Sequence, residues 1–216
     1  MRYLASEGIG QFLDIGSGIP TSGNVHEVAQ LANPAARVVY ADVDPVAIAH
    51  SKAILAGNDK AAIIDADVRQ PEKILANDTV SRLIDFTRPV GVLLLHVLNF
   101  VADADDPAQI IAYLREALCP GSYLVIAHVT GDGVSGDIEA RARATYDRAN
   151  DRLWPRAKDQ ILGFFDGFSL VEPGLTPVHE WRAGDDADDD GANDGAADGA
   201  VAGRDVTVAW AGVGRK

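Results

Sequence analysis

Cysteine and long apolar stretches are both scarce in this sequence. Its single cysteine, Cys119, excludes an internal disulfide and a metal site built from several thiolates. No apolar run approaches the roughly 18 residues that span a bilayer. The first residues, MRYLASEGIG, lack the apolar segment of a signal peptide. We therefore expect a cytoplasmic protein that has no membrane partner.

Positive charge is also scarce, with 19 Lys and Arg against 32 Asp and Glu and a net charge of −13. Because nucleic-acid binding depends on basic patches, this balance argues against a nucleic-acid partner. Residues 184–199 are rich in Asp, Gly and Ala and contain no basic residue. This composition predicts a disordered acidic insert. A calcium loop is the alternative, although the glutamate that closes such loops is absent.

Strand and helix patterns alternate along most of the chain. Asp44 and Asp106 each precede a proline, a pattern typical of a helix N-cap followed by the first helical residue. Residues 137–165 have a helical pattern that breaks at Trp154 and Pro155. Apolar runs predict strands at residues 12–15, 37–41, 61–64, 90–95, 123–129, 168–171 and 206–213.

Repeated strand–helix units favour a parallel sheet with helices on both faces. The last two predicted strands have no helix between them, so we expect them to pair as an antiparallel hairpin. The predicted fold is therefore α/β and Rossmann-like: one domain over residues 1–216, with a seven-stranded, mostly parallel sheet and an antiparallel C-terminal hairpin.

The stretch FLDIGSGIPTSGNV, residues 12–25, joins a strand to a helix through a glycine-rich turn, as nucleotide pockets do. In open parallel sheets, ligands bind at the carboxyl ends of the strands. The predicted binding residues follow the first four strands in order: Asp14, Gly16, Ser17 and Gly18; then Asp42 and Val43; then Asp67 and Val68; and finally His96.

These residues favour an adenosine that carries an amino acid instead of phosphates. Asp42 is placed to accept hydrogen bonds from two ribose hydroxyls, and Asp67 from an adenine amine. The third glycine of a pyrophosphate loop is displaced to Gly23, and no Walker lysine is present. Asp14 would repel phosphates but suits an ammonium group. The predicted cofactor is S-adenosylmethionine, and an NAD-dependent oxidoreductase is a weaker alternative.

Five blocks carry a family resemblance: QFLDIGSGIPTSGNVHEVAQ, RVVYADVDPVAIAHSKAIL, DADVRQPEKIL, RPVGVLLLHVLNFVADADDP and LCPGSYLVIAHV. They resemble class I methyltransferases, and more narrowly the actinobacterial S-adenosyl methyltransferase family that was once a domain of unknown function. The resemblance implies that Asp14, Gly16 and Gly18 surround the methionine end and that Asp67 and Val68 lie at the adenine. Family members carry an N-terminal segment that we expect to be missing here.

Methyl transfer needs a general base only when the acceptor holds a proton of high pKa. His96, just past the fourth strand, is the predicted catalytic residue, and His128, at the end of the fifth, competes for this role. His26 is expected to position the glycine turn. We predict a small-molecule acceptor and no metal site. The alternative is a domain that binds S-adenosylmethionine without turning it over.

Overall fold

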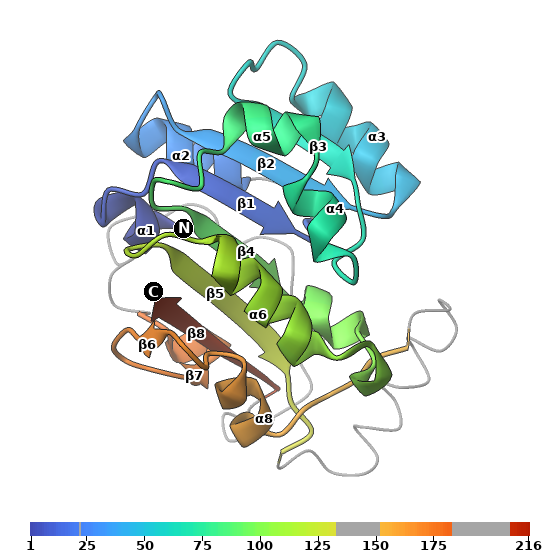
Figure 1. Ribbon diagram of the computed structural model, residues 1–216, viewed down its shortest axis with the longest axis vertical. Coiled ribbons are helices and arrows are strands. Elements are labelled where there is room, and N and C mark those ends of the chain that lie inside the picture. The colour runs from blue at the N-terminus through green and yellow to red at the C-terminus, as the bar shows by residue number, and fades with distance from the viewer. Residues whose placement is uncertain (22, 133–151, 183–207) are drawn as a thin grey trace.

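The protein forms one mixed sheet with helices on both faces (Figure 1). The computed structural model describes residues 1–21, 23–132, 152–182 and 208–216. The sheet has eight strands in the order β3-β2-β1-β4-β5-β8-β6, and β7 pairs with β8. The strands are β1 (Gln11–Ile15), β2 (Arg37–Asp42), β3 (Ala61–Asp65), β4 (Gly91–Leu95), β5 (Tyr123–Val129), β6 (Ser169–Leu170), β7 (Thr176–Pro177) and β8 (Ala209–Arg215).

Short helices connect these strands, and both predicted caps are confirmed. The Asp44 carboxylate accepts a hydrogen bond from the Val46 N–H at 2.8 Å, and Asp106 accepts one from the Gln109 N–H at 3.0 Å. The helices are α1 (Arg2–Ser6), α2 (Val25–Ala32), α3 (Pro45–Ile54), α4 (Pro71–Leu75), α5 (Asp78–Leu83), α6 (Pro107–Ala117) and α8 (Lys158–Gly163), with 3-10 turns η1 (Val97–Phe100), η2 (Asp103–Asp105) and η3 (Val178–Glu180).

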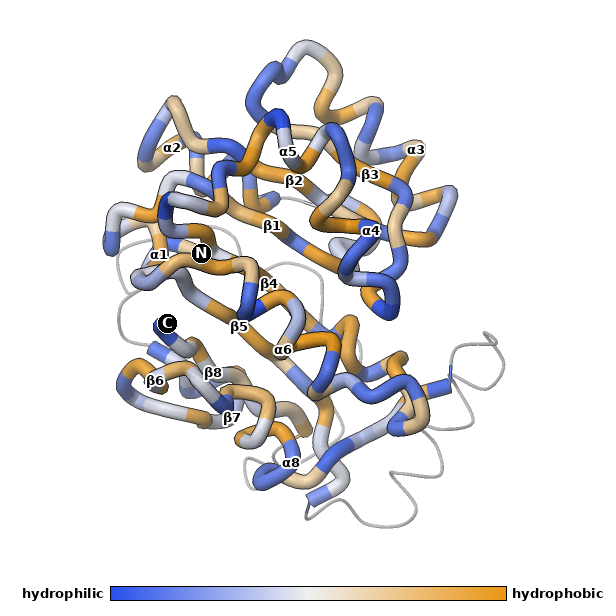
Figure 2. Tube along the Cα trace, in the orientation of Figure 1, coloured by the Kyte–Doolittle hydropathy of each residue, from blue (hydrophilic) through white to orange (hydrophobic). Residues whose placement is uncertain are grey.

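Alternate residues of the central strands pack into two separate cores. Leu13 and Ile15 of β1 belong to the core that includes side chains of α4, α5, α6 and α8. Phe12 of β1 and Val38 of β2 belong to the second core, beneath α1 and α2. Strands buried on both faces read as continuous apolar runs, and the central strands are mainly orange in Figure 2. By this alternation, Asp14 shares the face of Phe12.

The predicted parallel strands and the antiparallel pairing at the C-terminus are confirmed. The last strand lies between β5 and β6 and is antiparallel to both, and it continues to Arg215, two residues past its predicted end. Of the predicted helix at 137–165, the described part contains α8 alone; residues 137–151 and the acidic insert at 184–199 lie outside the described residues. Helices α1 and α5 and strand β7 were not predicted from the sequence.

The glycine turn after β1 is bonded to the end of β2 and packs against the turn after β4. Gly16 and Gly18 have φ angles of 73° and 66°, in the left-handed region that favours glycine. The Gly16 N–H donates to the Ala41 carbonyl at 2.7 Å. A Cβ built on Gly16 would lie 2.3 Å from a methyl carbon of Val97, whereas one on Gly18 would meet nothing within 4 Å. Position 16 therefore requires glycine for two reasons.

This difference predicts unequal effects of alanine at the two glycines. Gly18→Ala imposes only a left-handed backbone on a residue with a Cβ, at a cost of about 1 kcal/mol in the free energy of unfolding. Gly16→Ala adds the clash with Val97, for a total of about 3 kcal/mol. Denaturant unfolding of both variants measures the difference, and Val97→Ala should recover part of the Gly16→Ala loss. Equal losses in the two glycine variants would contradict this account.

Candidate functional site

The predicted site residues gather at the carboxyl ends of β1 to β4, where the strand order reverses between β1 and β4. The glycine turn follows β1, and Asp42 is the last residue of β2. Asp67 and Val68 follow β3, and His96 follows β4. Parallel register brings these four strand ends to the same edge of the sheet.

Asp42 connects the turn after β1 to the turn after β2. One carboxylate oxygen accepts a hydrogen bond from the Gly18 N–H at 2.7 Å, and the other accepts one from the Asp44 N–H at 2.9 Å. The residue is 9% exposed. Each carboxylate oxygen has a second lone pair, so Asp42 can accept from two ligand hydroxyls without releasing either backbone N–H.

Asp14 is a buried carboxyl group at the glycine turn, with 6% of its surface exposed. Burial, and secondarily the nearby Asp42 carboxylate, raise the pKa of Asp14 to about 7. Ser17 adds a second unusual group, because its buried Oγ has no hydrogen-bond partner among the described residues. A cationic hydrogen-bond donor would stabilise the ionised Asp14 and give Ser17 a partner.

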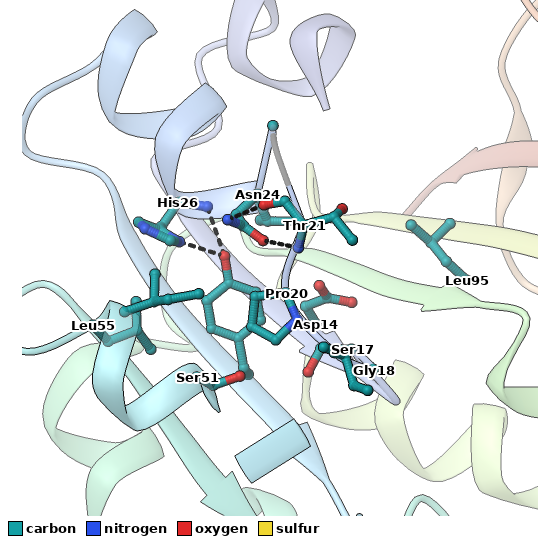
Figure 3. A pocket seen from close by; sticks show the side chains of 15 residues that line it. Asp14, Ser17, Gly18, Pro20, Thr21, Asn24, His26, Ser51, Leu55 and Leu95 are labelled. Carbon is teal, nitrogen blue, oxygen red and sulfur yellow. Dashed lines mark hydrogen bonds between the residues drawn. The ribbon is translucent and has the colours of Figure 1, made fainter. Parts of the chain in front are cut away.

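A cavity of about 230 Å³ opens beneath the glycine turn, between this turn and helices α2 and α3 (Figure 3). Asp14, Ser17 and Gly18 line it, together with His26 and Tyr40. The other predicted residues are not part of its lining and lie along the strand ends beside it.

Tyr40 and His26 fix the wall of this cavity on the side of α2. The Tyr40 hydroxyl accepts a hydrogen bond from the backbone N–H of His26 at 2.8 Å and forms a second hydrogen bond with His26 Nδ1, also at 2.8 Å (Figure 3). Burial lowers the pKa of His26 and raises that of Tyr40. These bonds join the first turn of α2 to β2, which agrees with the positioning role predicted for His26.

The residues after β2 and β3 present different groups to the edge of the sheet. Val43 is 55% exposed, whereas the Val68 side chain is buried in the core beneath α4 and α5. The Asp67 carboxylate accepts hydrogen bonds from the backbone and guanidinium of Arg69. Although partial burial acts in the opposite direction, these contacts lower the pKa of Asp67. Val68 therefore offers backbone groups, and Asp67 is ionised and already paired with Arg69.

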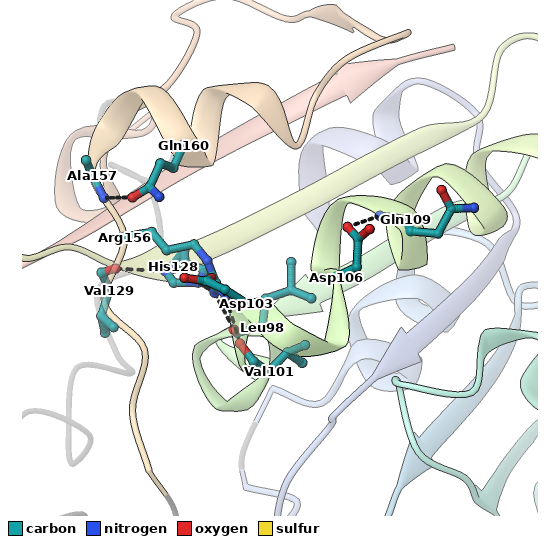
Figure 4. A network of polar contacts seen from close by, with 10 residues as sticks. All are labelled: Leu98, Val101, Asp103, Asp106, Gln109, His128, Val129, Arg156, Ala157 and Gln160. Atoms are coloured by element: carbon teal, nitrogen blue, oxygen red, sulfur yellow. Dashed lines mark hydrogen bonds and ion pairs between the residues drawn. The ribbon is translucent and has the colours of Figure 1, made fainter.

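His96 is exposed and has a left-handed backbone, with φ at 66°. Its N–H donates to the Ala127 carbonyl at 2.8 Å, and Val97 follows against Gly16. His128, which competes with it for a catalytic role, is fully buried and bonded to the Arg156 guanidinium (Figure 4). Burial is the main cause that lowers the pKa of His128 to about 4. The structure therefore leaves only His96 of this pair at the surface.

Sequence reasoning missed two residues that shape this edge. Tyr40 lies two residues before Asp42 on the same strand, so strand periodicity could have placed both on one face. Arg156 gave no such signal, because its partners Leu98, Val101 and Asp103 are more than 50 positions away in the sequence. Only the fold brings them together.

In the part of the chain that the structure describes, no three His, Cys, Asp or Glu side chains cluster in a way that could hold a metal ion. None of the described helices combines the length and the apolar character that crossing a membrane requires.

Solved structures that are similar to this chain include the following two proteins. A protein from Thermobifida fusca YX, solved as a candidate methyltransferase, is 38% identical and superposes with a TM-score of 0.84 over 100% of this chain and 76% of its own. A DUF574 family protein from Streptomyces avermitilis MA-4680 is 35% identical, with a TM-score of 0.85 over 100% of this chain and 79% of its own.

More distant structures show the fold alone. The N-methyltransferase NodS from Bradyrhizobium japonicum WM9, solved with S-adenosylhomocysteine, is 14% identical, with a TM-score of 0.53 over 100% of this chain and 83% of its own. A search of curated proteins gave no match.

The family model described as S-adenosyl methyltransferase matches residues 1–216, the full length of the sequence. This description agrees with the predicted class I fold and with S-adenosylmethionine as the predicted cofactor. The chain belongs to the S-adenosyl methyltransferase family.

Proposed function

We propose that this chain binds S-adenosylmethionine at the carboxyl edge of β1, β2 and β3 and transfers its methyl group to a small-molecule acceptor. The observation that carries the proposal is the pair of acidic groups at the glycine turn. Asp14 is buried and feels the Asp42 charge, and the Oγ of Ser17, which lines the same cavity, has no hydrogen-bond partner among the described residues. Two carboxyl groups disfavour phosphates and favour the ammonium group of a methionine.

The residues of the chain fit such a cofactor from end to end. Gly18 leaves open space where a Cβ would lie, so its backbone can approach the methionine end, and Gly16 turns the chain there through its left-handed backbone. Asp42 accepts from the two ribose hydroxyls. The exposed Val43 covers the adenosine, and Asp67 together with the backbone of Val68 contacts the adenine.

The cofactor supplies a methyl group that its sulfonium already activates, so the chain has three tasks: binding, alignment and exclusion of water. His96 lies where the acceptor would meet the glycine turn. The net charge of −13 favours a small-molecule acceptor over a nucleic acid. Release of S-adenosylhomocysteine during incubation with an acceptor would distinguish turnover from binding alone.

The raised pKa of Asp14 predicts that cofactor affinity depends on pH. An ammonium ligand binds the ionised carboxylate, so the chain must release the Asp14 proton when it binds below pH 7. With the pKa at about 7, S-adenosylhomocysteine should bind about tenfold more tightly at pH 8 than at pH 6. Calorimetry in buffers of different ionisation enthalpy measures both the affinity and the released proton.

The matched control for this experiment is Asp14→Asn, which keeps the shape and removes the titration. Its affinity should be lower and nearly independent of pH over the same range. Wild-type affinity that stays constant from pH 6 to pH 8, or an equal pH dependence in Asp14→Asn, would contradict the role given to Asp14.

The raised pKa of Asp14 also predicts that the stability of the ligand-free protein depends on pH. A folded-state pKa raised from 3.8 to about 7 contributes stability that is present below pH 3.8 and lost as the pH rises through 7. The free energy of unfolding of the wild type, minus that of Asp14→Asn, should therefore decrease by about 4 kcal/mol from pH 4 to pH 8. Urea unfolding of both proteins at several pH values tests this, and a constant difference would contradict it.

The proposed contact between Asp42 and the ribose predicts that alanine at Asp42 lowers cofactor affinity, whereas alanine at Asp44 does not. Asp42→Ala should reduce affinity for S-adenosylhomocysteine by about a hundredfold, because it removes the acceptor of both hydroxyls and the partner of the Gly18 N–H. Asp44→Ala should leave affinity within about threefold and reduce only stability, by about 1 kcal/mol, because its side chain caps α3. Unchanged affinity in Asp42→Ala would show that the ribose binds elsewhere.

A further inference from the structure

The side-chain amide of Asn99 has an orientation that the backbone fixes. Asn99 lies in η1 and is 3% exposed. Its Oδ1 accepts a hydrogen bond from the Val129 N–H at 3.1 Å, and a backbone N–H can only donate. The oxygen of the amide therefore faces β5. Its NH₂ group faces the other way, towards His96.

This orientation determines which nitrogen of His96 carries the proton. Asn99 Nδ2 lies 3.2 Å from His96 Nδ1. Because the NH₂ group is a donor, Nδ1 must offer its lone pair, so the imidazole proton is on Nε2. Although the residue is exposed, partial burial of the ring lowers the pKa of His96, which favours the neutral form at pH 7. Among the described residues, no hydrogen bond engages Nε2.

His128 is held in the opposite tautomer and is the titratable neighbour of His96. Its Nδ1–H donates to the Val129 carbonyl at 2.7 Å, and its Nε2 accepts from Arg156 at 2.9 Å (Figure 4). Arg156 is buried and also donates to the carbonyls of Leu98 and Val101. A second proton on His128 would face the Arg156 charge, so His128 cannot serve as a base.

We propose that His96 contacts the methyl acceptor as a neutral hydrogen-bond donor through Nε2–H, and not as the general base that the sequence predicts. This inference rests on the proposed function, which places the acceptor beside the glycine turn. The acceptor then presents a lone pair to His96 and arrives without the proton that a base would have to remove. A carboxylate or another oxyanion is the chemical class that fits.

The chemistry of such a transfer balances without a protein base. A lone pair of the oxyanion forms the new bond to the methyl carbon, and the electron pair of the broken sulfur–carbon bond stays on sulfur. The acceptor loses its negative charge and the sulfur its positive charge, so no proton is left to remove. The second oxygen of a carboxylate can remain hydrogen-bonded to Nε2–H throughout, because it does not attack.

The position of His96 supports this contact. Its left-handed backbone is held by the bond from its N–H to Ala127, and the next residue, Val97, packs against Gly16. His96 is therefore fixed between the end of β5 and the turn that is proposed to hold the methionine end. It is also exposed, as a residue that contacts a second ligand must be.

Long-range ¹H–¹⁵N NMR on the full chain labelled at histidine nitrogen reads the tautomer directly. We expect the Nε2–H form for His96 and the Nδ1–H form for His128. Asn99→Asp should move the proton of His96 from Nε2 to Nδ1, because a carboxylate can accept both from the Val129 N–H and from Nδ1–H of His96. The negative charge of the aspartate also raises the pKa of the His96 ring. A wild-type His96 in the Nδ1–H form would overturn the proposal.

Asn77→Asp is the matched control, because Asn77 caps α5 through the Thr79 N–H and aspartate caps equally well. It should leave the His96 signals unchanged. Unchanged His128 signals in Asn99→Asp show that the variant is folded. A folded Asn99→Asp chain that keeps the Nε2–H form of His96 would also overturn the proposal.

The class of acceptor is tested with formate, the smallest carboxylate, added to the chain saturated with S-adenosylhomocysteine. Formate should shift the His96 Nε2–H resonance, and methylammonium at the same ionic strength should not. A response to methylammonium, or none to formate, would contradict the oxyanion assignment. Calorimetry of S-adenosylhomocysteine alone tests the proposed function separately, because the tautomer of His96 is measured without it.

Discussion

The structure depends on one local constraint, the bonding of the glycine turn after β1 to the end of β2. The Gly16 and Gly18 N–H groups donate to the Ala41 carbonyl and to the Asp42 carboxylate. These two bonds fix the turn above the sheet, bring Gly16 into contact with Val97 from the turn after β4, and leave Asp14 buried below. The cavity, the acidity of the site and the position of His96 all depend on that placement.

Most of the fold and the positions of the candidate site residues could be predicted from the sequence. Parallel strands end at the same edge of a sheet, so side chains at the ends of successive apolar runs must lie near one another. This rule is enough to group Asp14, Asp42, Asp67 and His96. Caps such as Asp44 were also predictable, because a cap and the N–H that it bonds are two or three residues apart in the sequence.

The roles of individual side chains were less predictable, because they depend on partners that are distant in sequence. His96 was predicted as a base from its position alone, whereas its contact with Asn99 Nδ2 at 3.2 Å depends on an amide that a backbone N–H of β5 orients. Arg156 is likewise explained only by carbonyls more than 50 residues away. Short elements such as β7, with two residues, are too brief to show a periodic pattern.

The proposed function requires that this edge of the sheet holds an adenosine joined to an amino acid and not to a diphosphate. The most direct measurement is a calorimetric titration of S-adenosylhomocysteine into the chain, with NAD titrated in parallel. The acidic glycine turn predicts binding of S-adenosylhomocysteine at one site with micromolar affinity, and no heat of binding from NAD. Binding of NAD without binding of S-adenosylhomocysteine would contradict the proposed cofactor site.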